Sequence, residues 1–279
     1  MNRQSGTHES KDGSRSYPIL SRSKLRLHTV LSETGQAFTL FFQTLVQIFR
    51  PPLQFDLLIK QLLLIGVNSL AVVMVSGFFT GMVLGVQGYI QLKPYAVEGS
   101  VARFVCVSIV KELGPMITAF VLAGRIGASI TAELSTMKVT EQIDALEVMG
   151  TNPVKYLVVP RFLACTIMLP TLTIFSTFAG IGGGFTAVVA LFDVNGSFFL
   201  LEAQKNLYVG SVLISLIKAT SFGMAIAAVG CYKGFSISTA GGAEGVGTAT
   251  TGSAVISLIT ILILDFVLNH ILFNILGLV

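Results

Sequence analysis

This chain has very few charged residues for its length. Asp, Glu, Lys and Arg make up only 11% of its 279 residues, whereas hydrophobic residues make up 53% and the mean hydropathy is +0.80. Ordinary globular domains carry about 25% charged residues. The composition therefore excludes a typical soluble domain and predicts one all-α integral membrane domain.

Residue types that serve catalysis and metal binding are also scarce. The three histidines, His8, His28 and His270, are isolated from one another. The sequence contains neither a His-Glu-x-x-His helix nor a recognisable Ser/His/Asp set. We therefore expect no catalytic residue, no metal site and no cofactor in this chain, and we predict that it is not an enzyme.

Three cysteines and one Gly-rich segment could suggest other chemistry. The cysteines stand alone in or beside apolar runs, so we expect them to be buried as small hydrophobic residues. They are Cys106, Cys165 and Cys231. Residues 241–247 are Gly-rich but lack a preceding strand and a Lys-Ser/Thr pair. We interpret them as a flexible cytoplasmic loop and not as a phosphate loop.

The N-terminal segment carries the charge imbalance of the chain. The first 60 residues hold eight Lys/Arg against four Asp/Glu, and the remainder is neutral. A basic segment ahead of the first long apolar run predicts a cytoplasmic N-terminus, with attraction to anionic headgroups as a secondary effect. We expect residues 1–30 to be a disordered basic tail, with no cleavable signal sequence and no binding of nucleic acid.

Residues 36–50 have the spacing of an amphipathic helix. Apolar residues recur at i, i+3, i+4 and i+7 from Phe38 to Phe49, and Pro51 and Pro52 end the segment. We predict an interfacial helix that lies flat on the membrane with its Phe-rich face among the acyl chains. The alternative is a helix packed against the transmembrane bundle.

Five longer apolar runs follow, and each exceeds the about 20 residues that cross a bilayer as a helix. We predict transmembrane helices at about 62–89, 101–134, 156–191, 207–232 and 253–279. With the N-terminus inside, the loop at 133–155 and the loop before the last span face the cytoplasm. Gly77, Gly81 and Gly85 predict close helix packing, and Pro160 and Pro170 predict a kink or break in the third span.

Five charged residues interrupt the apolar runs. A charge at mid-bilayer costs about 2.5–3.5 kcal/mol and normally faces the protein interior or a water-filled cavity. These residues are Lys111, Glu112, Arg125, Lys218 and Asp265. Interhelical ion pairs, for example between Lys218 and Asp265, are one interpretation. For Glu112, which precedes a Leu-Gly-Pro sequence where a helix can bend and open, the other interpretation is a place in a cavity.

Residues 138–150 are a second candidate site, because they predict a helix that is too short and too charged to span a membrane. Apolar residues share one face, acidic residues share another, and Gly150 and Pro153 mark the end. The apolar residues are Val139, Ile143 and Leu146, and the acidic residues are Glu141, Asp144 and Glu147. The apolar face would lie uncovered, so we expect a partner protein to cover it. The alternative is an ordinary solvated loop helix.

Several motifs occur in one order along the chain: SGFFTGMVLGVQGY, KELGP, AGRIGASITAELSTMKVTEQIDALEVMGTNP, VPRF and LDFVL. Together they resemble the MlaE family, the permease subunits of Mla- and Mce-type ABC lipid transporters. The resemblance runs from about Phe38 to the C-terminus and implies an MlaE-type permease domain over residues 31–279. Its implied function is to move phospholipid or a related lipid between the inner membrane and an Mce-type partner, driven by a separate cytoplasmic ATPase.

The resemblance also implies partners and site residues. The chain would form a homodimer with two ABC ATPase subunits, which hold the ATP and Mg, and with an Mce-domain substrate-binding protein. The residues that would line a phospholipid cavity are Phe78, Val86, Tyr89, Lys111 and Glu112. Those that would couple a helix to the ATPase are Met137, Lys138, Glu141, Gln142, Asp144, Ala145 and Met149. Family members often have Arg at the Lys111 position, and Lys keeps the charge but loses the bidentate contact with phosphate.

The implied location is the bacterial inner membrane, with the plastid inner envelope as the alternative. Two other functions stay open. An ion-coupled secondary transporter would use Glu112 or Asp265 as a proton site, need no ATPase and show inverted repeats. A membrane scaffold would use its small residues only for assembly.

Overall fold

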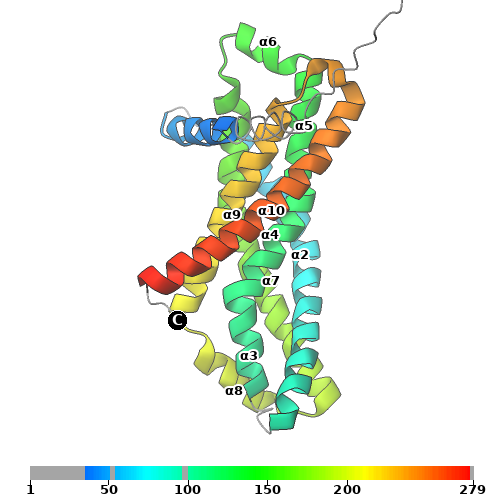
Figure 1. Ribbon diagram of the computed structural model, residues 1–279, viewed down its shortest axis with the longest axis vertical. Helices are drawn as coiled ribbons and strands as arrows, with labels where there is room; N and C mark the ends of the chain where they lie inside the picture. The colour runs from blue at the N-terminus through cyan, green and yellow to red at the C-terminus, as the bar shows by residue number, and fades with distance from the viewer. Residues whose placement is uncertain (1–34, 51–53, 96–99, 277–279) are drawn as a thin grey trace, which may run out of the picture.

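The computed structural model describes residues 35–50, 54–95 and 100–276, so the predicted tail at residues 1–30 lies outside the described part of the chain. All regular secondary structure in the described residues is helical. Five helical segments there are long and apolar enough to cross a membrane. The structure therefore confirms the predicted all-α membrane protein (Figure 1).

The spans differ in how they are built. The first span is α2 (Phe55–Leu92) with η1 (Lys93–Tyr95), and the third is the π-helix η5 (Val154–Val158) with α7 (Val159–Phe192). The fourth span is α9 (Val209–Phe235), and the fifth is α10 (Gly242–Leu276). The second consists of α3 (Val101–Ser108), the π-helix η3 (Ile109–Leu113), α4 (Gly114–Leu122), the π-helix η4 (Ala123–Gly127) and α5 (Ala128–Val139). Between spans lie α6 (Gln142–Val148), α8 (Gly196–Asn206) and η6 (Thr239–Gly241).

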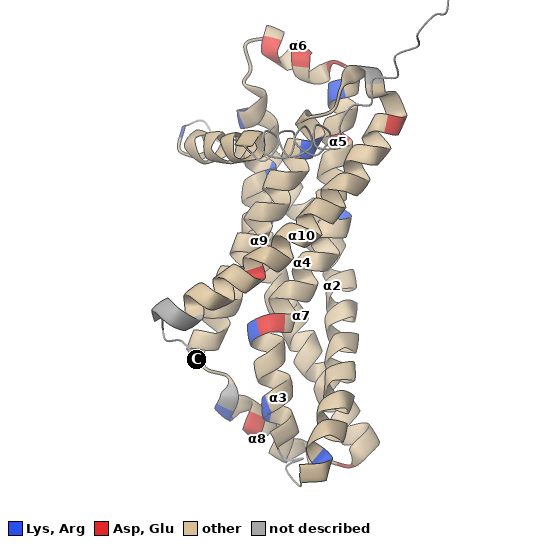
Figure 2. Cartoon of the chain, viewed as in Figure 1, with Lys and Arg blue, Asp and Glu red and all other residues tan. Residues whose placement is uncertain are grey.

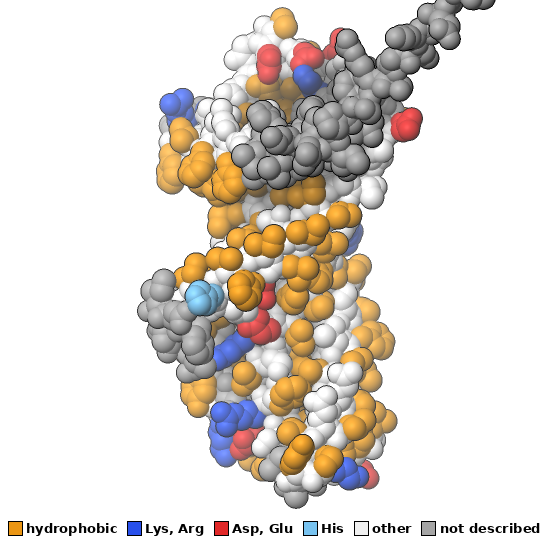
Figure 3. Space-filling model, viewed as in Figure 1, with side chains coloured by type: hydrophobic (Ala, Val, Ile, Leu, Met, Phe, Trp, Pro, Cys, Tyr) orange, Lys and Arg blue, Asp and Glu red, His pale blue; other side chains and the backbone are white. Residues whose placement is uncertain are grey.

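The two ends of the bundle carry different short helices. The helix at residues 35–48 and α6 lie toward one end, and α8 lies at the opposite end (Figure 1). Charged residues gather toward both ends, with a few more between them (Figure 2). Hydrophobic side chains cover much of the visible face between the ends (Figure 3). This distribution suits a bundle whose middle faces lipid and whose ends face water.

The helix at residues 35–48 lies across the bundle, as an interfacial helix would (Figure 1). Its predicted apolar face is divided between two environments. Phe41 packs edge-on against Phe162 of α7, with ring centroids 5.7 Å apart. Phe38 and Phe42 are about 60% exposed and line a groove of about 580 Å³ that reaches Val154. One side of the helix therefore packs on the bundle, as the alternative has it, while the other side is exposed, and its place among acyl chains stays a prediction.

Close packing of α2 against α7 depends on glycine. A side chain at Gly77 would lie 2.5 Å from the carbonyl oxygen of Ser176, and one at Gly81 would overlap the carbonyl of Gly180. The predicted small-residue seam is confirmed, and its partner is α7 of the same chain. α7 contains Pro170 but runs without interruption to Phe192, so the predicted break is absent from it.

Several predicted segments have different bounds in the structure, and two of these differences change an interpretation. The last span begins at Gly242 and not near residue 253, so the segment that we interpreted as a flexible loop is mostly the first turns of α10. The helix predicted at 138–150 is divided, because α5 continues to Val139 and α6 begins only at Gln142. Glu141 between them adopts a left-handed conformation, with φ of 58°, which ends one helix before the next begins.

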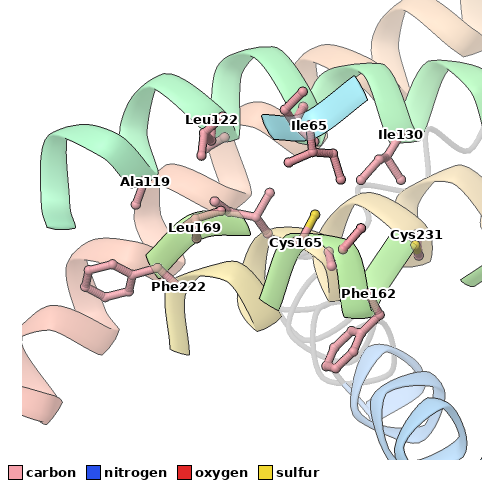
Figure 4. Packing of buried hydrophobic residues seen from close by; sticks show 14 of the residues in the cluster. Ile65, Ala119, Leu122, Ile130, Phe162, Cys165, Leu169, Phe222 and Cys231 are labelled. Carbon is pink, nitrogen blue, oxygen red and sulfur yellow. The ribbon is translucent and has the colours of Figure 1, made fainter. Parts of the chain in front are cut away.

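The main hydrophobic core joins α2, α4, α5, α7, α9 and α10 (Figure 4). Ile65, Leu122 and Leu169 point into the space between the helices, Phe222 lies to one side of them, and all four are almost fully buried. A smaller core lies around α3, α7 and α8, where Phe199 of α8 is buried. The three cysteines are free and buried, as predicted.

Candidate functional site

Lys218 of α9 is fully buried among polar groups from two other segments. Its Nζ donates to Glu112 Oε2 over 2.6 Å and to the carbonyl oxygen of Lys111 over 3.3 Å. Nζ also lies 3.1 Å from Asp265 Oδ1. Asn269, one turn after Asp265 on α10, donates to Glu112 Oε2 over 3.1 Å. The ion pair expected between Lys218 and Asp265 is therefore present, and Glu112 and Asn269 join it to form the buried charge cluster.

The KELGP motif explains why the cluster forms at η3. Pro115 has no N–H group, so the carbonyl of Lys111, four residues earlier, loses its normal helical donor. The wider π-helical turn lets the Gly114 N–H bond the carbonyl of Ile109 instead. An unpaired carbonyl in a bilayer costs several kcal/mol. The Lys218 ammonium donates a hydrogen bond to the carbonyl of Lys111 and also pairs with the two carboxylates.

The cluster is open to its surroundings on one side. The Lys218 side chain is 0% exposed and that of Asp265 is 14% exposed, whereas that of Glu112 is 42% exposed. Within the described residues, no hydrogen bond or ion pair engages the ammonium of the half-buried Lys111. Acidic and basic side chains are visible together on the face below α10 (Figure 3). Glu112 and Lys111 are thus the accessible charges of this region.

The other predicted cavity residues lie on α2. Phe78, Val86 and Tyr89 are each half-buried there. Tyr89 stacks on Phe192 at the end of α7, with centroids 4.0 Å apart, and Lys93 lies 5.7 Å from the Tyr89 ring. These contacts place Tyr89 beside α7, and a part in lipid binding stays a prediction for all three residues.

Arg125 is separate from the cluster. It lies on η4, and its Nη1 donates to the carbonyl oxygen of Asn68 on α2. The Arg125 side chain is exposed. Of the five intramembrane charges, Glu112, Lys218 and Asp265 thus form one network, and Arg125 makes a separate contact between two spans.

α6 differs from the helix that we predicted in how it is covered. Ile143 is 1% exposed and packs in the main core, and Leu146 packs against that core. The expectation that this apolar face lies uncovered was wrong, because the chain itself covers it. The exposed apolar residues are instead Val148, at 89%, and Met149, at 69%, at the C-terminal end of α6.

The candidate coupling residues fall into two groups. Lys138 and Asp144 form an ion pair of 2.6 Å that closes the turn between α5 and α6. Gln142 and Glu147 of α6 are exposed, as is Glu141, which directly precedes α6. Met137 lies near the end of α5, Gln142 and Ala145 lie on α6, and Met149 follows it. Gly150, with φ of 75°, ends α6 as predicted.

Arg161, the Arg of the VPRF motif, was not among the predicted site residues. Its side chain is 6% exposed, and its Nη2 lies 2.8 Å from Glu133 of α5. Its Nη1 donates to the carbonyl oxygen of Leu157 over 2.7 Å. The pair joins the end of the second span to the start of the third, at the base of the segment that carries α6. The signal in the sequence was a charged residue within an apolar run.

These features define a multi-pass helical membrane protein with interior charges, as in transporters and channels. The chain belongs to the MlaE permease family, because the family model described as Permease MlaE matches residues 58–271. The chain is 40% identical over 250 residues to a probable ABC transporter permease protein of Rickettsia prowazekii, which covers 89% of this chain and 96% of that one.

Two further relatives extend the comparison. One is the intermembrane phospholipid transport system permease protein MlaE of Haemophilus influenzae, 37% identical over 241 residues, covering 86% of this chain and 92% of the relative. The other is a probable ABC transporter permease protein of Pyropia yezoensis, 34% identical over 254 residues, covering 91% of this chain and 96% of the relative.

Proposed function

We propose that this chain is the permease subunit of an ABC transporter that moves phospholipid or a related lipid between the inner membrane and an Mce-type partner. The observation that carries the proposal is the family match, which extends from the first span to the last. The Haemophilus relative is named as a phospholipid transport permease. The chain would act as a homodimer with a separate ATPase that holds the ATP and Mg.

The charge cluster supports an amphipathic substrate. Lys111 and Glu112 offer accessible charges within a span whose other residues are largely apolar. An apolar hollow of about 100 Å³ is lined by Val110, next to Lys111, and by Ser215, one turn before Lys218. A molecule with a charged headgroup and apolar chains suits such surroundings better than an ion or a sugar.

α6 supports docking of the ATPase. It stands at one end of the bundle, with Glu141 and Glu147 exposed beside the apolar Val148 and Met149 (Figures 1 and 2). Acidic groups around an apolar pair suit a partner groove with basic residues at its rim. Since Ile143 and Arg161 hold the base of the segment in the bundle, a push on α6 would reach α5 and α7. ATP-driven closure of the partner would then change the shape of the lipid site.

The test is ATPase activity that co-purifies with this chain from native membranes through a tag. We compare the wild type with Glu141→Lys plus Glu147→Lys, because neither acid takes part in the Lys138–Asp144 ion pair. The control is Glu244→Lys, which changes an exposed acid at the start of α10. We expect ATPase activity to be lost only in the α6 variant, with the chain still folded. A stable wild-type preparation without ATPase activity would contradict the proposal.

A secondary transporter is the second candidate, because Glu112 is a partly exposed carboxylate within a span. Such a transporter would need proton exchange at Glu112 and no ATPase. The Glu112→Gln variant would then lose all proton-coupled transport.

A further inference from the structure

We propose that the lipid site beside the charge cluster prefers zwitterionic headgroups, with Glu112 accepting the headgroup ammonium and Lys111 facing the phosphate. The inference rests on the proposed function, because it specifies which class of phospholipid the permease binds. It follows from the charge, hydrogen bonds and exposure of five residues.

The first argument is the charge of the cluster. Lys218 supplies one positive charge, whereas Glu112 and Asp265 supply two negative charges, so the three groups together carry a net charge of −1. The positive member is 0% exposed, and the exposed member is Glu112. A ligand that approaches the cluster therefore meets the Glu112 carboxylate at its open side, and Lys111 is the other accessible charge there.

The second argument is the free acceptor capacity. Lys218 and Asn269 both donate to Glu112 Oε2, and in the described part of the chain Oε1 accepts no hydrogen bond. Asp265 Oδ1 is buried and has no hydrogen bond of good geometry, although Lys218 Nζ lies 3.1 Å away. A carboxylate has room for about four donors. The cluster therefore retains acceptors for a cationic group, and Glu112 Oε1 is the exposed one.

The third argument is the position of Lys111. It precedes Glu112 directly, so the two side chains leave the helix about 100° apart, and a headgroup with two charged groups would bridge them. Within the described residues its ammonium has no partner. An ammonium is a compact point charge that suits a phosphate oxygen. Lys111 and Glu112 thus offer one positive and one negative charge on consecutive residues, which is the complement of a phosphate and an ammonium in one headgroup.

An anionic headgroup fits less well. Its phosphate would pair with Lys111, but it has no ammonium for Glu112, so that carboxylate would gain no partner from the ligand. A partly exposed ion pair contributes about 1 kcal/mol, which corresponds to about a fivefold preference. We therefore expect about a fivefold preference for a zwitterionic lipid over an anionic lipid with the same acyl chains.

The experiment is a competition for the complex purified through this chain. The complex is placed in nanodiscs with equal amounts of phosphatidylethanolamine and phosphatidylglycerol with identical acyl chains, and bound lipid is quantified by native mass spectrometry. In the wild type we expect about five zwitterionic lipids for each anionic lipid. Glu112→Gln should lower this ratio to about one, whereas the matched control Glu244→Gln should retain it.

Lys111→Gln gives a second measurement that leaves the contact between Glu112 and Lys218 intact. We expect total bound lipid to fall, because both headgroups lose their phosphate partner, while the ratio stays at or above the wild-type value. Equal binding of both lipids to the wild type, or a ratio of one in Lys111→Gln, would overturn the inference and leave the proposed function standing. A wild-type complex that binds no lipid would overturn both.

Discussion

Lys218→Met should be the most destabilising single change in the charge cluster. Methionine has a similar length, but it supplies neither the charge nor the donors that Lys218 directs at Glu112, Asp265 and the carbonyl of Lys111. The variant would leave two carboxylates near each other, one of them 14% exposed, without the cation that lies between them. It would also leave a carbonyl beside Pro115 without a donor.

The magnitude follows from the distances. At an effective dielectric constant of about 20, charges 2.6 Å and 3.1 Å apart attract by about 6 and about 5 kcal/mol. Desolvation of the buried ammonium offsets several kcal/mol of this attraction, and the exposure of Glu112 weakens its share. Removing one partner of a buried ion pair typically costs about 3–5 kcal/mol. We therefore expect the melting temperature to fall by about 10 °C, since 1 kcal/mol corresponds to about 2–4 °C in a chain of this size.

The assay is thermal unfolding of the purified protein in one detergent. The matched control is Lys205→Met, because Lys205 is 69% exposed and pairs with Glu202 on the surface, so its melting temperature should change by less than about 3 °C. The triple variant Lys218→Met, Glu112→Gln and Asp265→Asn should recover much of the loss, because no unpaired carboxylate remains in the cluster. Equal melting temperatures of Lys218→Met and the wild type, or no recovery of the melting temperature in the triple variant, would show that Lys218 does not stabilise the cluster through its charge.

Three further changes test the packing around the site. Gly81→Ala should lower the yield of folded protein, because its methyl group would overlap the carbonyl of Gly180. The control Gly182→Ala should fold normally, because its methyl group would meet nothing within 4 Å. Size-exclusion chromatography measures the yield of folded protein for both variants. Arg161→Gln should lower the melting temperature by several degrees, because it removes the ion pair with Glu133, and an unchanged value would show that the pair contributes little. Ile143→Ala should destabilise the protein by about 2–5 kcal/mol, whereas Val148→Ala should stay within about 0.5 kcal/mol, because Ile143 is buried and Val148 is 89% exposed. Equal effects of these last two changes would contradict the position of α6.

Much of the architecture could be predicted from local patterns. Hydropathy identified the five spans because a bilayer requires long apolar helices with all backbone groups bonded internally. The Gly77, Gly81 and Gly85 spacing predicted a close contact, although the sequence did not show that α7 would fill it. The start of α10 was missed because glycine has a low intrinsic helix propensity, which a long continuous helix can overcome.

The candidate site could be predicted less completely from the sequence, because it depends on contacts between segments that are distant along the chain. Lys218 and Asp265 were expected to pair, but Glu112 lies 106 residues from Lys218, and no local pattern joins them. Asn269 carries no charge, so its place in the charge cluster could not be predicted from charged residues within apolar runs. Pro115 was an available signal, since it removes the donor for the carbonyl of Lys111. The apolar face of α6 appeared uncovered because periodicity shows which residues share a face but not what packs against it.

The most direct test of the proposed function is lipid transfer by the complex purified through a tag on this chain and reconstituted in liposomes. Fluorescent phosphatidylethanolamine would be followed into acceptor liposomes with and without ATP, and with and without a proton gradient. An ABC permease predicts transfer that requires ATP and Mg and does not respond to the gradient. Transfer that follows the proton gradient and ignores ATP would contradict it and favour a secondary transporter.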